Sequence, residues 1–247
     1  MRTHPLSKDR IETIKKHIAT SPYKNSLPSK FEQLSHARIK AKLAAFLKRP
    51  DKNFSPSKTI KKSITAQYAQ AITFHKNGYT EPAIKLINDL ILKDPRNPYF
   101  YQLKGQFQFE SGHLRKALKS LNSAIRLLPD APLFRLLTAQ IQLEMNDQAV
   151  LNPAIANLKF ALTSEPASPS IWRSLAIAYG KKGEIGNKSL ALAEESFLIG
   201  KFDIAKYHAG RAESLFPNGS RKWLHSQDIL AAILNSQRKT KSNKAKK

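Results

Sequence analysis

An interval of 34 residues separates matching positions in the middle of this chain. Three positions recur at this interval, because Gly78, Ala83 and Pro95 return as Gly112, Ala117 and Pro129. The alanine and proline positions return twice more, at longer intervals, as Ala154 and Pro166 and as Ala205 and Pro217. A fixed period of this length is typical of proteins built from stacked structural units. We therefore expect an array of repeats in which each unit packs on its neighbours.

A period of 34 residues in helical sequence is typical of tetratricopeptide repeats (TPRs), which are pairs of antiparallel helices. That pattern places small residues at repeat positions 8, 20 and 27, where helix backbones approach to about 8–10 Å. A proline at position 32 ends the second helix, because proline cannot donate the next backbone hydrogen bond. An irregular helical bundle would not hold alanines and prolines in one frame. The sequence thus predicts an all-α, TPR-type α-solenoid of antiparallel helix hairpins with a C-terminal capping helix.

The frame divides the chain into units of unequal length. We expect a solenoid over 63–236, with repeats at 64–97, 98–131, 132–168 and 186–219, an extra helix at 169–185 and a cap at 220–236. The third repeat is three residues longer than the others, and the insertion lies between its helices, near MNDQAV (145–150). The 51 residues between Pro166 and Pro217 correspond to a repeat and a half, which accounts for the extra helix with Trp172.

Positive charge is concentrated in the two flanks of the repeat region. The net charge is +24, and residues 1–62 hold 16 Lys and Arg against 4 Asp and Glu. We expect this lead to form two helices and linkers, the second helix near 31–48. Residues 237–247 hold 6 basic and no acidic residues, and are expected to be a basic disordered tail. The tail has no aromatic residue that could stack on bases, so nucleic acid is not the expected partner. A basic nucleic-acid or anionic-surface binder remains an alternative.

No motif for catalysis or metal binding is visible in the sequence. The chain has no cysteine and seven histidines, and no two histidines stand three or four residues apart as in an HExxH zinc helix. We therefore expect no catalytic residue, no metal and no cofactor in this chain, which would not be an enzyme on its own. No apolar run of about 18 residues is present, so no transmembrane segment is expected.

Several stretches nevertheless resemble one enzyme family. The segment RTHPLSKDRIE (2–12) resembles the part that follows the catalytic domain in HtpX-like (Ste-type) zinc metallopeptidases. The stretches at 97–112, 171–194 and 222–230 resemble the C-terminal TPR region of the bacterial members of that family. The catalytic domain with its HExxH helix is missing, so the chain resembles the tail of a truncated protease.

The resemblance implies a non-catalytic interaction module that docks on a protease domain and recruits protein substrates or envelope-assembly partners. An alternative is the tail half of a split zinc metalloendopeptidase that acts in trans with a separate HExxH half. Zinc belongs to the full-length family, and His4 would lie at the rim of its site only with a catalytic half present. The chain has no export signal and is cytoplasmic by default, or periplasmic as a fragment of an exported family protein.

The groove of such a solenoid is expected to bind a protein or peptide segment. TPR stacks present positions 2, 5, 9, 12 and 13 of their first helices on the concave face. Nine residues at these positions are the candidates: Tyr68, Ile72, Tyr99, Gln102, Gln106, Phe109, Leu136, Gln140 and Arg173. Tyr68 and Ile72 replace the lysine and asparagine that clamp a terminal carboxylate in chaperone-type TPRs, which argues against that ligand. Aromatic anchors and amides suit an extended, partly apolar segment. Alternatively, Phe109 and Leu136 pack against neighbouring helices.

Overall fold

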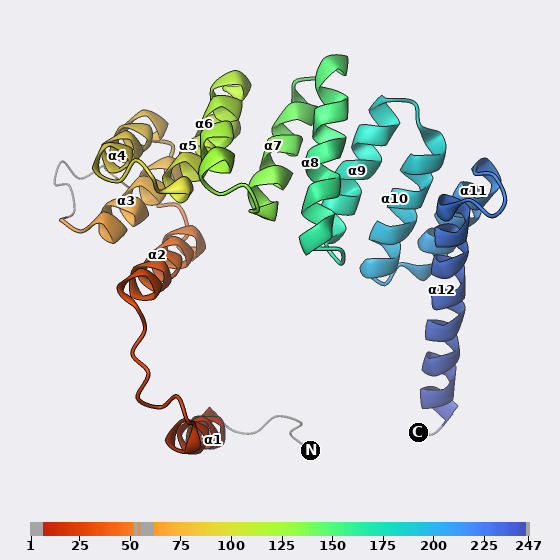
Figure 1. Ribbon diagram of the computed structural model, residues 1–247, viewed down its shortest axis with the longest axis horizontal. Coiled ribbons are helices and arrows are strands. Elements are labelled where there is room, and N and C mark those ends of the chain that lie inside the picture. The colour runs from red at the N-terminus through yellow and green to blue at the C-terminus, as the bar shows by residue number, and fades with distance from the viewer. Residues whose placement is uncertain (1–6, 52–53, 55–61, 246–247) are drawn as a thin grey trace. The chain divides into compact units, whose positions relative to one another are not determined.

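The computed structural model describes residues 7–51, 54 and 62–245 (Figure 1). Within these ranges the chain forms twelve α-helices and one short 3₁₀ turn, with no strand. The prediction of an all-α fold is therefore confirmed. None of the helices in this described part is long and apolar enough to cross a membrane. The chain forms two compact units, Met1–Asn77 and Gly78–Lys247.

The first unit contains α1 (Ser7–Thr20), α2 (Lys30–Leu47) and α3 (Ile64–Lys76), and α2 packs on α3. A capping box starts α2, because the Glu32 amide donates to the Ser29 hydroxyl while the Ser29 amide donates to the Glu32 carboxylate. At the other end of α2, the Lys76 ammonium from α3 donates to the carbonyls of Phe46 and Lys48, the latter at 2.6 Å. A cation at a helix C-terminus satisfies free carbonyls and favours the helix dipole.

The second unit is a continuous series of helices, each of which packs on the next in chain order. Its elements are α4 (Thr80–Lys93), α5 (Pro98–Glu110), α6 (Leu114–Leu127), α7 (Pro132–Glu144), η1 (Gln148–Val150), α8 (Leu151–Ser164), α9 (Pro169–Lys181), α10 (Ile185–Leu198), α11 (Phe202–Leu215) and α12 (Arg221–Ala245). Contacts also join α5 to α7 and α7 to α9, the first helices of successive hairpins. Each hairpin therefore contacts the hairpins next to it in the chain, which is the packing of a solenoid.

Alanines occupy the closest helix crossings, as the repeat frame predicts. Those at the second and third small positions are fully buried, as is Ala193 at the first small position of the last repeat: Ala83, Ala117, Ala124, Ala154, Ala161, Ala193, Ala205 and Ala212. At the first small position of the second repeat stands Gly105, and a Cβ added there would lie 2.9 Å from Leu121 Cγ and 3.2 Å from the Ala117 carbonyl oxygen. The larger apolar residues Leu121 and Leu158 are likewise fully buried between the helices.

The turns inside the hairpins explain the three-residue insertion. The turn between α5 and α6 has Gly112 at φ 78°, a left-handed conformation that glycine adopts without a Cβ clash. The longer third hairpin has no glycine there. Asn146 takes the left-handed conformation at φ 52°, and the 3₁₀ turn η1 then leads into α8. Asparagine is one of the few other residues that tolerate this conformation, so the extra length is absorbed between the helices as expected.

The C-terminal part differs from the predicted arrangement in two ways. The helix expected as an extra half-repeat, α9, packs on α8 and forms a hairpin with α10. Helix α12 continues to Ala245, beyond the predicted end of the cap at 236 and into the segment expected to be a disordered tail. Residues 237–245 contain neither glycine nor proline and four of them are lysine or arginine, which are good helix formers. The helix therefore has no local signal that would end it at 236.

Helix α12 covers the end of the solenoid. Its Ile229 and Ile233 are buried together with Ala205, Ala209 and Ala212 of α11. The His225 ring hydrogen-bonds the Glu194 carboxylate of α10, and it lies edge-on to the Trp172 ring of α9 at 6.3 Å between centroids. The hydrogen bond to Glu194 raises the pKa of His225 above its ordinary value of 6.5, against the opposing effect of burial. Asp228 adds a smaller effect in the same direction.

Replacing glycine by alanine should have opposite effects at two helical positions. Gly105→Ala forces a methyl group into Leu121 and a backbone carbonyl, so we expect the free energy of unfolding to fall by about 1–3 kcal/mol. Gly210 of α11 has nothing within 4 Å of an added Cβ. Gly210→Ala should therefore stabilise by about 0.5–1 kcal/mol through helix propensity. Denaturant unfolding of both variants checks this. Equal effects would contradict the close crossing at Gly105.

The stabilising effect of His225 should depend on pH. Because its pKa is raised in the folded state, the contribution is complete below the unfolded pKa of about 6.5 and disappears as pH rises through the folded pKa. We expect wild type to be more stable than His225→Gln at about pH 6, with the difference shrinking by about pH 8.5. Thermal unfolding of the two proteins across this range measures it. A difference that grows with pH would contradict the pairing of His225 with Glu194.

Candidate functional site

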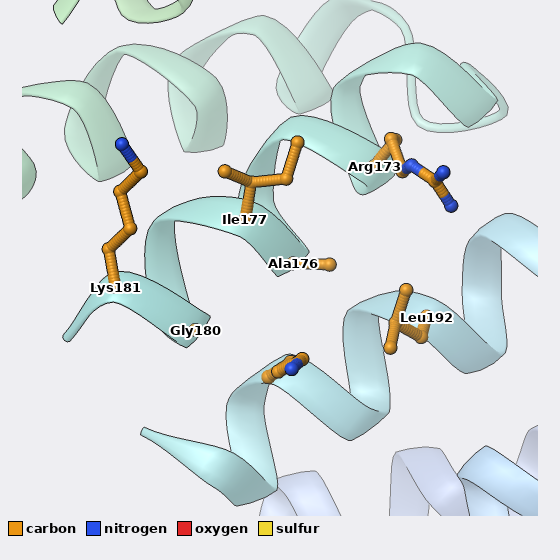
Figure 2. A pocket seen from close by; sticks show the side chains of 7 residues that line it. Arg173, Ala176, Ile177, Gly180, Lys181 and Leu192 are labelled. Carbon is orange, nitrogen blue, oxygen red and sulfur yellow. The ribbon is translucent and has the colours of Figure 1, made fainter. Parts of the chain in front are cut away.

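Three side chains form an exposed stripe along α9. Arg173, Ile177 and Lys181 follow at intervals of four residues, which places them one above the other on one helix face. Figure 2 shows the Arg173 and Lys181 side chains on either side of Ile177. Ile177 is 45% exposed, so an apolar side chain is open to solvent between the two cations. A hollow adjoins the stripe on each side.

The first hollow lies between α7 and α9 and reaches Phe109 of α5. Its volume is about 420 Å³. Its lining combines apolar, amide, hydroxyl and charged groups: Phe109, Gln140, Leu143, Glu144, Ser170, Arg173, Ser174, Ile177 and Lys181. The hollow thus runs across the first helices of three successive hairpins.

The second hollow lies between α9 and α10 and has a volume of about 450 Å³. Its floor is made by Ala176, Ile177, Gly180 and Leu192, and Figure 2 shows Leu192 of α10 projecting toward the Ala176 side of α9. Lys188 of α10 lies over Gly180, since a Cβ added to Gly180 would be 3.4 Å from the Lys188 Cδ. We call the stripe and its two hollows the α9 groove.

Two of the cations in the α9 groove are held by neighbouring helices. The Arg173 guanidinium forms an ion pair with Glu195 of α10 at 3.2 Å. The Lys181 ammonium donates to the Leu143 carbonyl at 2.7 Å and to the Asn146 side-chain oxygen at 3.2 Å. Lys181 thereby caps the C-terminus of α7, as Lys76 caps α2 in the first unit. These bonds fix the positions of the charges and join α9 to the helices on both sides.

A histidine lies close to the charges of α10. Burial, with Arg211 and Lys188 as smaller influences, lowers the pKa of His208 on α11, although Glu195 opposes the shift. The ring is therefore neutral at pH 7, and its Nδ1 atom is buried without a hydrogen-bond partner. His208 adds no positive charge to the surroundings of Lys188.

Three of the nine predicted groove residues come together in the first hollow. Phe109, Gln140 and Arg173 all line it. Gln106 belongs to a polar chain along α5, because it accepts a hydrogen bond from Gln102 at 3.2 Å and donates one to Glu110 at 2.8 Å. Tyr99 is half-buried and packs edge-on against Phe134 at 5.8 Å between ring centroids.

Four predicted groove residues are core residues instead, which corrects the prediction for them. Tyr68, Ile72, Gln102 and Leu136 are 1%, 0%, 7% and 9% exposed. Leu136 belongs to the apolar cluster that contains Leu143 and Ile171. Its burial there is favourable because it removes apolar surface from water. His4, expected at the rim of a zinc site, lies outside the described residues. Within the described ranges, no group of three or more His, Asp or Glu side chains could hold a metal ion.

Lys188 and Leu192 line the second hollow but are not among the predicted groove residues. The predicted frame begins a new repeat at 186, so it does not pair α10 with α9. The signal that could have found them is the hydrophobic pattern of α10, in which Leu190, Ala191 and Ala193 are buried while Leu192 is only partly so. Which helix α10 packs against is decided by packing, and the predicted 34-residue frame alone does not show it.

Two solved structures with low sequence identity share the fold. A structure described as MamA 41-end from Desulfovibrio magneticus RS-1 is 12% identical, covering 73% of this chain and 98% of its own, with a TM-score of 0.53. One described as the crystal structure of MamA is 17% identical, covering 70% and 96%, with a TM-score of 0.51. A thermophilic TPR protein from Thermus thermophilus matches at 16% identity, 68% and 100% coverage and a TM-score of 0.44. No protein-family model matches the chain, and a search of curated proteins finds no match.

Proposed function

We propose that this chain is a protein-interaction module that binds a segment of a partner protein in the α9 groove. The observation that carries the proposal is the exposed Ile177 between two hollows, in a surface that also offers amide and hydroxyl groups. Large apolar side chains in a concave, partly polar surface are typical of recognition sites. The TPR-type fold supports the same class of function, because such solenoids present extended binding surfaces.

The dimensions of the groove suit an extended segment. Neighbouring helices of a solenoid lie about 8–10 Å apart, and an extended chain rises about 3.3 Å per residue. In the polyproline II form of an extended chain, every third side chain lies on the same face about 9 Å further along. Side chains three residues apart in such a segment would therefore enter the two hollows on either side of Ile177. Gln140, Ser170 and Ser174 line the first hollow and can pair with the backbone of the segment.

Contacts within the chain hold the helix that carries the groove. Leu175 and Tyr179 of α9 are buried in a cluster that includes Leu143 and Leu158, below the surface stripe. The Lys181 bond to Leu143 and the Arg173 pair with Glu195 fix α9 against α7 and α10. A preorganised surface loses little conformational entropy on binding, which leaves more of the contact energy for affinity.

The resemblance to metallopeptidase tails supplies one specific partner to test. A separately encoded HExxH domain would then bind this chain, and the pair would cleave protein in trans. This narrower proposal rests on the sequence stretches at 2–12, 97–112, 171–194 and 222–230 alone. Co-expression of such a domain with this chain, followed by a zinc-dependent cleavage assay, tests it. Cleavage that does not require this chain would contradict it.

Substitution of Ile177 tests the groove directly. A displayed library of random peptides of about 12 residues is panned against the protein, and the dissociation constants of selected peptides are measured by fluorescence anisotropy. Ile177→Gln removes an apolar contact of about 1–2 kcal/mol, so we expect roughly tenfold weaker binding.

Ile204→Gln on α11 is the matched control, because Ile204 is 47% exposed and lies outside both hollows. Binding to this variant should equal that of wild type. Peptides that bind wild type and Ile177→Gln equally would show that the groove is not the binding site.

A further inference from the structure

We infer that the α9 groove selects an acidic segment of another protein, with carboxylates over α9 and α10 and an apolar side chain on the floor between them. The inference rests on the proposed function and adds the chemistry of the partner. Its basis is the lining of the second hollow, which contains Arg173, Lys181 and Lys188. Among the described residues that line this hollow, none is acidic.

The cations remain available to a ligand although two of them have partners within the chain. The Arg173 side chain is 62% exposed, whereas its partner Glu195 is 13% exposed. Both Arg173 contacts with Glu195 use the Nη1 atom, and a guanidinium has five N–H donors in all. Arg173 can therefore donate to a second carboxylate on the solvent side while Glu195 holds the guanidinium in place. Lys188 is exposed, and its aliphatic stem lies over Gly180 at the edge of the hollow.

Of the described residues that line the two hollows, Glu144 on α7 is acidic, whereas Arg173 and Lys181 are basic and line both hollows. Glu144 lines the first hollow from α7, and Glu110 at the end of α5 accepts a hydrogen bond from Gln106. The α10 side carries Lys188 and no acidic lining residue. A bound segment would be repelled if its carboxylates lay over α5 and α7 and attracted if they lay over α9 and α10. The charges thus favour one placement of an acidic segment, which is how complementary potentials fix register.

The flanks of this chain cannot be the occupant. Residues 1–62 contain 16 basic against 4 acidic residues, and residues 237–247 contain 6 basic and none acidic. Either flank, from the same chain or from a second copy, would bring lysines and arginines against Arg173, Lys181 and Lys188. Like charges brought together in an interface disfavour that partner.

The floor of the second hollow favours a peptide over nucleic acid. Ala176, Ile177 and Leu192 are aliphatic, and no aromatic ring is among the described residues that line this hollow. Single-stranded nucleic acid is held by stacking of bases on aromatic side chains in addition to phosphate contacts. An aliphatic floor instead matches an aliphatic side chain of a peptide.

The test uses three synthetic peptides that share two leucines three residues apart and differ only at the residues between and beside them. These positions carry Asp and Glu in one peptide, Asn and Gln in the second, and Lys in the third. A single-stranded oligothymidylate of about 12 nucleotides is the fourth probe. At about 50 mM salt we expect the acidic peptide to bind roughly tenfold more tightly than the amide peptide, and the lysine peptide most weakly.

Lys188→Gln should weaken binding of the acidic peptide roughly three- to fivefold and leave binding of the amide peptide unchanged. Lys85→Gln on α4 is the control, because Lys85 is exposed and lies outside the α9 groove. This substitution should change the affinity of neither peptide. Equal affinity of the acidic and amide peptides would overturn the inference, as would tighter binding of the oligonucleotide that is lost in Lys188→Gln.

The same peptides separate this inference from the proposed function. If the acidic and amide peptides bind equally but both weaken in Ile177→Gln, the groove is a binding site and its charge selectivity is wrong. If Ile177→Gln changes the affinity of no peptide, the proposed function itself is wrong. If the acidic peptide alone responds to Lys188→Gln, both stand.

Discussion

Close contact between helix backbones is the constraint on which the second unit depends. The alanines at its crossings, among them Ala117, Ala154 and Ala205, are fully buried, and the Cα of Gly105 faces Leu121 and a backbone carbonyl with no room for a methyl group. A larger side chain at any of these points would push two helices apart, and the displacement would pass to the next hairpin because each contacts only its neighbours. The positions of side chains on the opposite surface follow from these contacts. The α9 groove therefore depends on alanines that no partner touches.

Lys181 of the α9 groove has a structural role beside its proposed role in recognition. Lys181 caps the last turn of α7 through the Leu143 carbonyl, and Lys76 makes the equivalent contact with the end of α2 in the first unit. Each is the last residue of its own helix, Lys76 of α3 and Lys181 of α9. The lysine keeps its positive charge in such a cap, because the carbonyl that it contacts is neutral. The groove keeps a positive side chain whose position is fixed, which is what orientation of an acidic ligand requires.

The sequence predicts the architecture well because its signals are local and repeated. Alanines and prolines in one frame specify crossings and helix ends, and the insertion near Asn146 is visible as a change in spacing. Exposure is less predictable, because it depends on which neighbour a helix meets. Tyr68 and Ile72 occupy nominal groove positions and yet are fully buried. Lys188 was missed because the predicted frame begins a new repeat at 186, whereas α9 and α10 form one hairpin. The length of α12 was missed because its basic end was interpreted by charge rather than by helix propensity.

The departure from a uniform array has a physical consequence for binding. In a regular TPR stack, the concave surface is lined by first helices alone, and second helices form the outer layer. Here α9 pairs with α10, and both contribute to the second hollow through Ile177, Lys188 and Leu192. That hollow combines an apolar floor with cations from two helices, whereas the first hollow adds amides, hydroxyls and the Glu144 carboxylate to Arg173 and Lys181, which line both. Under the proposed function, two adjacent environments of different polarity, joined by one exposed isoleucine, would discriminate between segments by the order of their residues as well as by composition. Such a combination would give specificity that a uniform lining would lack.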